Sequence, residues 1–315
     1  MSTKELFAHY GRQFGTLIGL IGLCLVLWIL TPYFLTVSNL LNVAQQISII
    51  AIIAVGMTFV IITAGIDLSV GSVLAFSGMV IGSVLQAGVA LPIAIFVGLF
   101  VGGLSGIVNG VLITYGRLPP FISTLGMMSV ARGAARLITK GRPISGFSES
   151  FRDLATAEVF NVPLPVLIMA GVYLVAYFVL ARTKLGRYTY AMGGNEEAAI
   201  LSGVNVKAYK IAVYGLCGML SGLAAIILTA RLNSAGPNAG IMYELDAIAA
   251  TVIGGTSLMG GEGTITGTLI GALIMGVLRN GLNLLGISSY IQDIVIGAVI
   301  ILAVLMDMAL KRQRN

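Results

Sequence analysis

The chain has 315 residues, 57% of them hydrophobic and 10% charged, with a formal net charge of +6. Because a soluble domain has about 25% charged residues, this composition excludes an ordinary soluble protein and indicates a polytopic membrane protein. The excess of positive charge is expected to orient the chain across a membrane, and nucleic acid is not expected as a partner.

Ten apolar stretches approach the length that crosses about 30 Å of hydrocarbon. They are expected at about 14–32, 44–64, 68–88, 90–114, 120–139, 163–181, 208–231, 244–260, 264–284 and 288–307. The sequence therefore predicts an all-α polytopic membrane protein, in which residues 1–315 form one domain of about ten transmembrane helices. Two alternatives stay open for the fifth and eighth helices, which either span fully or are broken: the fifth carries Arg132 and Arg136, and the eighth contains the glycine-rich segment 254–263.

An even number of spans places both termini on the same side of the membrane. Most of the basic residues then lie on the side of the termini, which the positive-inside rule identifies as the cytoplasm. Short cytoplasmic tails are therefore expected at 1–13 and 308–315, with a longer cytoplasmic loop at about 182–210.

Very few residues separate the second and third spans, in the run Ile66-Asp67-Leu-Ser-Val-Gly71. Asp67 or Ser69 is expected to cap the following helix by accepting its free N–H groups. The alternative is a broken-helix hinge near a transport route, because irregular backbone at membrane depth must line protein or water.

Glycine recurs at every fourth position in two spans. The fourth span has Gly98, Gly102, Gly106 and Gly110, and the ninth follows with Gly263, Gly267 and Gly271. Such ridges let helices approach closely in a membrane, where lipid offers no hydrophobic force for association. Close packing within the subunit is the favoured interpretation, and sliding during transport is the alternative.

A set of amide side chains lies at or near membrane depth and supplies hydrogen-bonding partners for a polar solute. These candidates for the translocation path are Gln45, Gln46, Asn109, Asn280 and Asn283. Arg279 and Asp293 are expected to form an ion pair near the outer ends of the last two helices, which lowers the cost of each charge.

Several function classes find no support in the residues. Only Asp293 and Asp246 are expected as carboxylates within the membrane, and the one histidine precedes the first span, so proton coupling is disfavoured. No metal-ligand cluster, Cys/His pair or nucleophile elbow is present, and no lysine is followed by Ser or Thr as a P-loop requires. The chain is therefore not expected to be an enzyme or to bind a cofactor or metal, and any ATP must bind to another subunit.

The loop at 182–210 contains a short predicted helix. Asn195 can cap it, while Glu196 and Glu197 suit its positive first turn. Ala198, Ala199, Ile200 and Leu201 offer a small apolar docking surface, and Gly203 ends the helix. The spacing of Glu197-Ala198-Ala199 and Gly203 resembles the EAA loop, through which the ATPase of an ABC importer moves its permease. The residues expected to contact that ATPase are Asn195, Glu196, Glu197, Ala198, Ala199, Leu201 and Gly203.

Further motifs occur in the same order over about residues 32–307. They are Gly65-Ile-Asp-Leu-Ser-Val-Gly71, Leu185-Gly-Arg-Tyr188, Gly193-Gly-Asn-Glu196, Leu201-Ser-Gly-Val-Asn205, Tyr243-Glu-Leu-Asp-Ala-Ile-Ala-Ala250, Gly254-Gly-Thr-Ser-Leu258 and Asn280-Gly-Leu-Asn-Leu-Leu-Gly286. Together they resemble the ribose-type permeases, the membrane subunits of bacterial monosaccharide ABC importers. One departure is that the Leu-Pro of the general EAA pattern is absent after Gly203, which leaves the docking geometry open.

The resemblance implies a multi-pass subunit of the bacterial inner membrane with a fold similar to the vitamin B12 importer class. It implies a second permease copy, a cytoplasmic ABC ATPase that holds ATP and Mg²⁺, a periplasmic sugar-binding protein and surrounding membrane lipid. The expected function is import of a monosaccharide, with ribose as the expected sugar, by alternating access. The alternatives are an ion-coupled secondary carrier, a passive channel and a membrane scaffold, and the exact sugar stays open.

Overall fold

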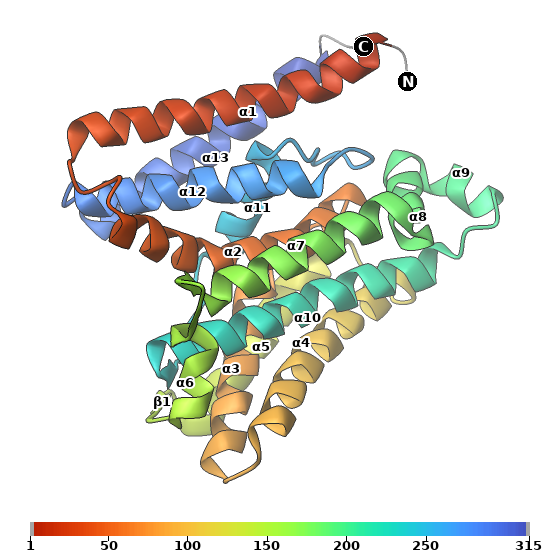
Figure 1. Ribbon diagram of the computed structural model, residues 1–315. Helices are drawn as coiled ribbons and strands as arrows, with labels where there is room; N and C mark the ends of the chain where they lie inside the picture. Colours follow the sequence, from red (N-terminus) through yellow and green to blue (C-terminus); the bar gives the residue numbers. More distant parts are fainter. Residues whose placement is uncertain (1–2, 313–315) are drawn as a thin grey trace.

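The computed structural model describes the backbone of residues 3–312 and the side chains of residues 14–305 and 308, so the predicted tails at 1–13 and 308–315 lie almost wholly outside the described side chains. Helices make up most of the fold (Figure 1). The elements are α1 Thr3–Leu30, α2 Val37–Ile62, α3 Val70–Gln86, α4 Leu91–Thr114, α5 Pro120–Thr139, β1 Ile144–Ser145, α6 Glu149–Thr156, β2 Glu158–Val159, β3 Val162–Pro163, α7 Leu164–Arg182, α8 Lys184–Gly194, α9 Glu196–Leu201, α10 Val206–Leu232, β4 Ser234–Ala235, α11 Tyr243–Ile253, α12 Ile265–Leu284 and α13 Ser289–Arg312.

Among the described residues, five helices are long and apolar enough to cross a membrane: α2, α4, α7, α10 and α12. Three shorter apolar stretches lie in α1, α3 and α13. The fifth predicted span is one continuous helix, α5, so it is not broken. The eighth is helical only over α11, which has 11 residues and is followed by irregular backbone up to the start of α12.

The two ends of the molecule differ. The short helices α8 and α9 lie at one end, and α6 with the small strands lies at the other (Figure 1). At that second end β1 pairs with β4 in antiparallel register, with Ile144 opposite Ala235, and β2 pairs with β3 as a hairpin. The β1–β4 pairing joins the segments that follow α5 and α10 at the α6 end of the bundle, and the β2–β3 hairpin connects α6 to α7.

The centre of the bundle is α2. Its sequence is apolar on all sides, and from Ile47 to Ile62 nearly every residue is buried. A helix that is apolar all round is stable only when other elements surround it. Here α7, α10, α11 and α12 all pack against α2.

Close packing through the predicted glycine ridges is confirmed. A Cβ on Gly106 would overlap the carbonyl oxygen of Tyr214, and one on Gly218 would overlap that of Gly102, so α4 and α10 touch backbone to backbone. Likewise, a Cβ on Gly271 would overlap the carbonyl oxygen of Ala250, which brings α12 against α11. Small residues at such crossings let helices pack without a side-chain layer between them.

Candidate functional site

The predicted cytoplasmic loop folds into two short helices, α8 and α9. Thr183 precedes α8, and its hydroxyl accepts the N–H of Gly186. The predicted Asn195 cap is present, because the Asn195 side chain accepts the N–H of Ala198 at 2.9 Å. The chain leaves α9 through Gly203, whose φ of +82° is a left-handed conformation that glycine adopts without strain.

The exposed face of α9 differs in one position from the predicted docking surface. Ile200 and Leu201 are 54% and 88% exposed, so they form an apolar tip. Ala199 is buried against Met192 and Val206, and its expected place on the docking surface is therefore wrong. Packing of α9 on the start of α10 turns this side of the helix inward.

Besides the packing of Ala199 on Val206, polar and backbone contacts attach α8 and α9 to the rest of the molecule. Glu196 forms an ion pair with Lys210 of α10 at 2.6 Å. The hydroxyl of Tyr190 donates to the carbonyl oxygen of Gly263 at 2.7 Å, and burial raises the pKa of Tyr190 to about 12, so this donor keeps its proton at neutral pH. A Cβ on Gly193 would overlap the carbonyl oxygen of Ile62, which places α8 directly against the end of α2.

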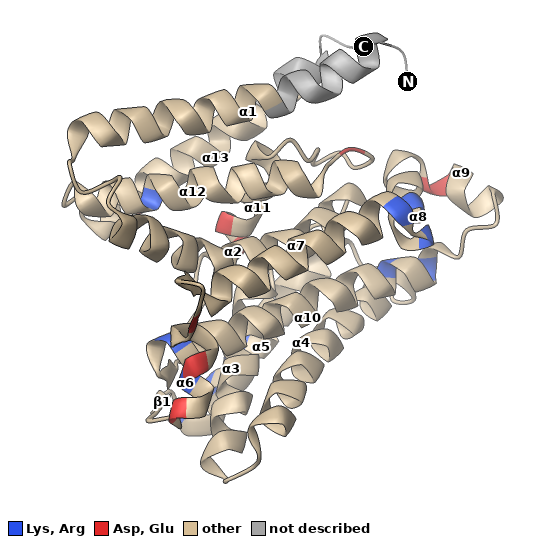
Figure 2. Ribbon diagram, viewed as in Figure 1, with Lys and Arg blue, Asp and Glu red and all other residues tan. Residues whose placement is uncertain are grey.

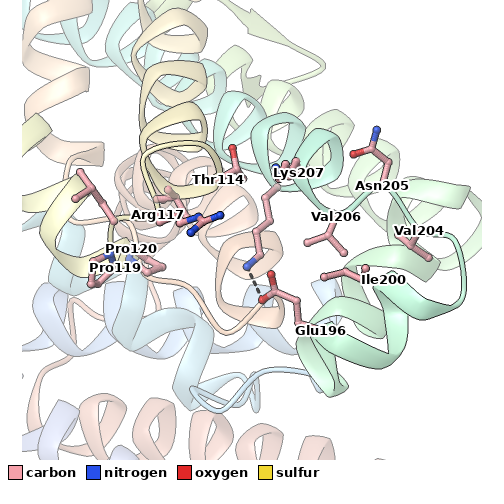
Figure 3. Close-up of a pocket in the computed structure, with 13 residues that line it drawn as sticks. Thr114, Arg117, Pro119, Pro120, Glu196, Ile200, Val204, Asn205, Val206 and Lys207 are labelled. Atoms are coloured by element: carbon pink, nitrogen blue, oxygen red, sulfur yellow. Dashed lines mark hydrogen bonds and ion pairs between the residues drawn. The ribbon is translucent and has the colours of Figure 1, made fainter.

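A pocket of about 550 Å³ lies between α9, the start of α10 and the turn from α4 to α5. Glu196, Lys207 and Arg117 line it, as Figure 3 shows, and so does Lys210, the ion-pair partner of Glu196. Pro119 and Pro120 form part of the opposite wall. The pocket is a hollow beside α9 that is lined by three cations and one carboxylate.

A buried polar network begins at the break between α2 and α3. Asp67 is only 1% exposed, and its Oδ1 accepts the N–H and the hydroxyl of Ser69 at 2.9 and 2.6 Å. The Ser69 Oγ accepts from Asn109 Nδ2 of α4 at 3.0 Å, and Ser123 of α5 donates to Asn109 Oδ1 at 3.4 Å. Four side chains thus connect the break to α4 and α5.

This network corrects two expectations. The Ser69 side chain makes no capping bond to α3, so that part of the expected cap is wrong. Asp67 accepts the N–H of Ser69, one residue before the helix begins, and holds the break itself. The sequence also led us to expect only Asp246 and Asp293 as carboxylates within the membrane. Asp67 is a further carboxylate, deeply buried, and that expectation did not include it.

The amides expected on the translocation path have partners within the chain. Gln45 donates to the carbonyl oxygen of Ala155 at 2.6 Å, and Asn283 accepts from Gln292 at 2.8 Å. Asn280 and Asn39 exchange two hydrogen bonds of 2.9 and 3.0 Å. Asn109 is buried in the network of Asp67, which leaves Gln46 as an exposed member of the predicted set.

The predicted ion pair between Arg279 and Asp293 is wrong. Arg279 of α12 instead bonds both carboxylate oxygens of Asp246 of α11 at 3.0 Å. Both bonds are donated by Nη2 of Arg279, and the buried Asp246 carboxylate thereby obtains a compensating charge. Asp293 is exposed on α13.

One face of α5 is exposed and carries small or polar residues between the exposed apolar side chains of Ile122 and Leu137, a feature that the sequence had not led us to expect. Gly126, Ser129, Gly133 and Arg136 lie three or four positions apart on this face. No atom lies within 4 Å of where a Cβ would be placed on Gly126 or Gly133. The spacing of these residues in the sequence could have predicted the face, because residues three and four positions apart lie on the same side of a helix.

Charges gather at the two ends of the bundle (Figure 2). Lys and Arg cluster around α8 and the start of α10, and α6 carries acidic residues at the other end. Near that other end, Arg132 donates to the carbonyl oxygens of Pro237 and Ala239 at 2.9 and 2.7 Å. The guanidinium of Arg132 therefore faces protein.

Comparison with known proteins gives one family. A family model described as the permease component of the branched-chain amino acid transport system matches residues 39–304. The ribose import permease protein RbsC of Escherichia coli strain K12 is 53% identical over 296 residues, which cover 93% of this chain and 92% of that protein. The RbsC of Bacillus subtilis strain 168 is 48% identical over 312 residues, covering 98% and 97%.

A third relative is the D-allose transport system permease protein AlsC of Escherichia coli strain K12, which is 41% identical over 303 residues and covers 96% of this chain and 93% of its own. No solved structure matches the chain. The resemblance that the sequence motifs indicated is confirmed. The chain therefore belongs to this family of transport-system permease components, in which its relatives include the ribose-type permeases of ABC importers.

Proposed function

We propose that this chain is the membrane permease subunit of an ATP-driven importer that moves ribose into the bacterial cytoplasm by alternating access. The observation that carries the proposal is the identity of 53% and 48%, over nearly the whole chain, to proteins named ribose import permeases. The identity of 41% to a D-allose permease makes another monosaccharide the next substrate to test.

The proposed topology has ten crossings of the inner membrane. The five long apolar helices, the three shorter ones, α5, and α11 with the segment after it would supply them. The α8–α9 end is placed in the cytoplasm, because basic residues gather there (Figure 2). This arrangement also puts both termini in the cytoplasm and fits the expected likeness to the vitamin B12 importer class.

We place the contact with the partner ATPase at α9. Its tip, Ile200 and Leu201, is apolar and exposed on a helix that the Glu196–Lys210 pair ties to α10. Such a helix can enter a cleft on a cytoplasmic protein and transmit its movement. ATP and Mg²⁺ would be held by that ATPase, and nucleotide can shift the permease only through a difference in affinity between its two states.

The translocation path is proposed to follow the exposed face of α5 against a second permease copy. Gly126, Ser129 and Gly133 leave room along this face, and Ser129 offers a hydroxyl to a sugar. The predicted path residues Gln45, Asn109, Asn280 and Asn283 already use their amides within the chain. A periplasmic sugar-binding protein would deliver the sugar at the α6 end.

The test combines uptake with retention of the ATPase. Vesicles that contain the permease, its ATPase and its binding protein are supplied with labelled ribose, with and without ATP. Leu201→Glu is compared with Phe160→Glu, because both replace highly exposed apolar side chains, 88% and 97% exposed, at opposite ends of the molecule. The amount of ATPase that co-purifies with each tagged permease is measured in parallel.

We expect ATP-dependent uptake by the wild type, and loss of both uptake and the co-purified ATPase for Leu201→Glu. Phe160→Glu should retain the ATPase. Ribose uptake without ATP would indicate a carrier or a channel and overturn the importer. Uptake of allose but not of ribose would change the substrate, and normal ATPase retention by Leu201→Glu would remove α9 from the interface.

A further inference from the structure

An apolar groove runs along the side of the bundle between α4, α7 and α10. Its volume is about 850 Å³, and every residue that lines it is glycine, alanine or a larger apolar residue. Val55 and Phe59 of α2 form part of the lining. The groove therefore offers no polar partner along its length and suits a hydrocarbon chain.

Glycines make the groove as open as it is. Gly103 of α4, Gly171 of α7 and Gly215 of α10 all line it. A Cβ on Gly171 would have no atom within 4 Å, and one on Gly103 would come no closer than 3.7 Å to any atom. The space beside Gly103 and Gly171 is therefore free, whereas a Cβ on Gly215 would lie 3.0 Å from the Ile107 side chain of α4.

One end of the groove is basic. Leu185 and Ala208 line that end, and each follows an exposed lysine, Lys184 and Lys207. Arg182, also exposed, ends α7 beside them. Figure 2 shows this gathering of positive charge around α8 and the start of α10.

The acidic residues near this end are Glu196 and Glu197 of α9 and Glu262 of the loop that packs against α8 before α12. Glu196 is already engaged by Lys210 at 2.6 Å, so its charge is not available to Lys184 or Lys207. The exposed Lys207 also lines the hollow beside α9, with its Nζ 4.9 Å from the centroid of the Tyr115 ring, and it stands at the end of the groove because Ala208, the next residue, lines it. The apolar groove matches the acyl chain of a phospholipid, and the cations at its end match an anionic headgroup.

We propose that this groove binds a phospholipid with an anionic headgroup. One acyl chain lies along Gly103, Gly171 and Gly215, and the phosphate lies against Lys184 and Lys207. Basic pockets between transmembrane helices at the membrane surface bind such headgroups. A second copy of this chain is a poorer occupant, because a two-fold axis here would bring like charges together.

The lipid would join α7 to α10 directly beside α8 and α9. It would therefore stiffen the part of the molecule that carries the proposed coupling helix. Binding itself depends only on the chain being in a membrane, so it stands or falls independently of the sugar and of the ATPase.

The experiment uses the full-length permease, purified in detergent and studied by native mass spectrometry. Phosphatidylglycerol and phosphatidylcholine with identical acyl chains are added in turn. The wild type should retain one phosphatidylglycerol in preference to phosphatidylcholine. The double variant Lys184→Gln, Lys207→Gln should lose about 30-fold of that preference, the factor that two basic residues near a membrane surface supply.

A second variant tests the groove. Gly171→Leu places a side chain in the free space and should weaken binding of both lipids. The control is Lys140→Gln with Arg142→Gln, two exposed basic residues near the other end, which should leave the preference unchanged. Equal retention of both lipids by the wild type would overturn the proposal. An equal loss of the phosphatidylglycerol preference in the control variant would also overturn it. Disulfide crosslinking of two copies through Gly171→Cys would overturn it too, because a second copy would then occupy the groove.

Discussion

Replacement of Asp67 by alanine should destabilise the permease without touching any proposed binding surface. The carboxylate is 1% exposed and accepts the N–H and the hydroxyl of Ser69. Each buried donor that loses its acceptor costs about 1–3 kcal/mol, so the two together predict a loss of about 2–6 kcal/mol. Asp67→Asn keeps an oxygen in place of Oδ1 and should recover at least half of that loss.

The assay is a heating series on tagged permease in detergent, with the folded fraction measured by size-exclusion chromatography. Asp67→Ala should lower the apparent melting temperature by at least about 4 °C, whereas the exposed carboxylate in Asp153→Ala should leave it unchanged. If Asp67→Ala melts with the wild type, the carboxylate does not hold the α2–α3 break. If Asn109→Ala and Asp67→Ala lower the melting temperature additively in the double variant, the side chains do not act as one network.

Two further predictions concern packing and charge. Arg279→Met leaves the buried Asp246 carboxylate without its cation and should cost about 3 kcal/mol of stability, the lower end of the range for a broken buried pair, because Arg279 is 34% exposed. Adding Asp246→Leu should restore the melting temperature in the same heating series. An unchanged melting temperature for Arg279→Met alone would refute the pair. Gly106→Ala should lower the free energy of unfolding by about 1–3 kcal/mol, because its Cβ meets the Tyr214 carbonyl oxygen. Gly171→Ala has free space around it and should be neutral or stabilising. Equal melting temperatures of the two variants would contradict the close crossing of α4 and α10.

The sequence predicted correctly those features that depend only on neighbouring residues in the chain. Asn195 caps α9 because the capping geometry depends on the next three residues alone. The ridge from Gly98 to Gly110 predicted close packing, since a glycine face at helical spacing has few other uses in a membrane. The long apolar helices also follow from length and hydropathy, which need no knowledge of their neighbours.

Choices of partner could not be predicted in the same way. Arg279 bonds Asp246, which is 33 positions away, although Asp293 is closer in the sequence. The choice depends on how α11 packs against α12, and that packing is set by the whole bundle. The amide of Asn109 likewise joined Ser69 and Ser123, because burial in the bundle makes an internal partner obligatory for a polar group.

The inward turn of Ala199 has a related cause. A helix of six residues has less than two turns, so its own sequence does not select a buried face. Contacts with Met192 and Val206 select that face, and they in turn expose Ile200 and Leu201. The motif therefore located the helix, while tertiary packing determined which of its side chains a partner can reach.

In the proposed mechanism, the type of contact between helices decides which parts move together. α4 and α10 meet backbone to backbone, so they cannot slide without losing close packing, and the Glu196–Lys210 pair adds α9 to this unit. The α2–α3 break is different, because its backbone is not helical and side chains such as Ser69 hold it by hydrogen bonds that can change partners. Since α8 abuts Ile62 at the end of α2, movement imposed by the ATPase should reach α5 through this break. Folded Asp67→Asn permease should then hydrolyse ATP with its partner while importing less sugar per ATP than the wild type, and an unchanged ratio would place the coupling route elsewhere.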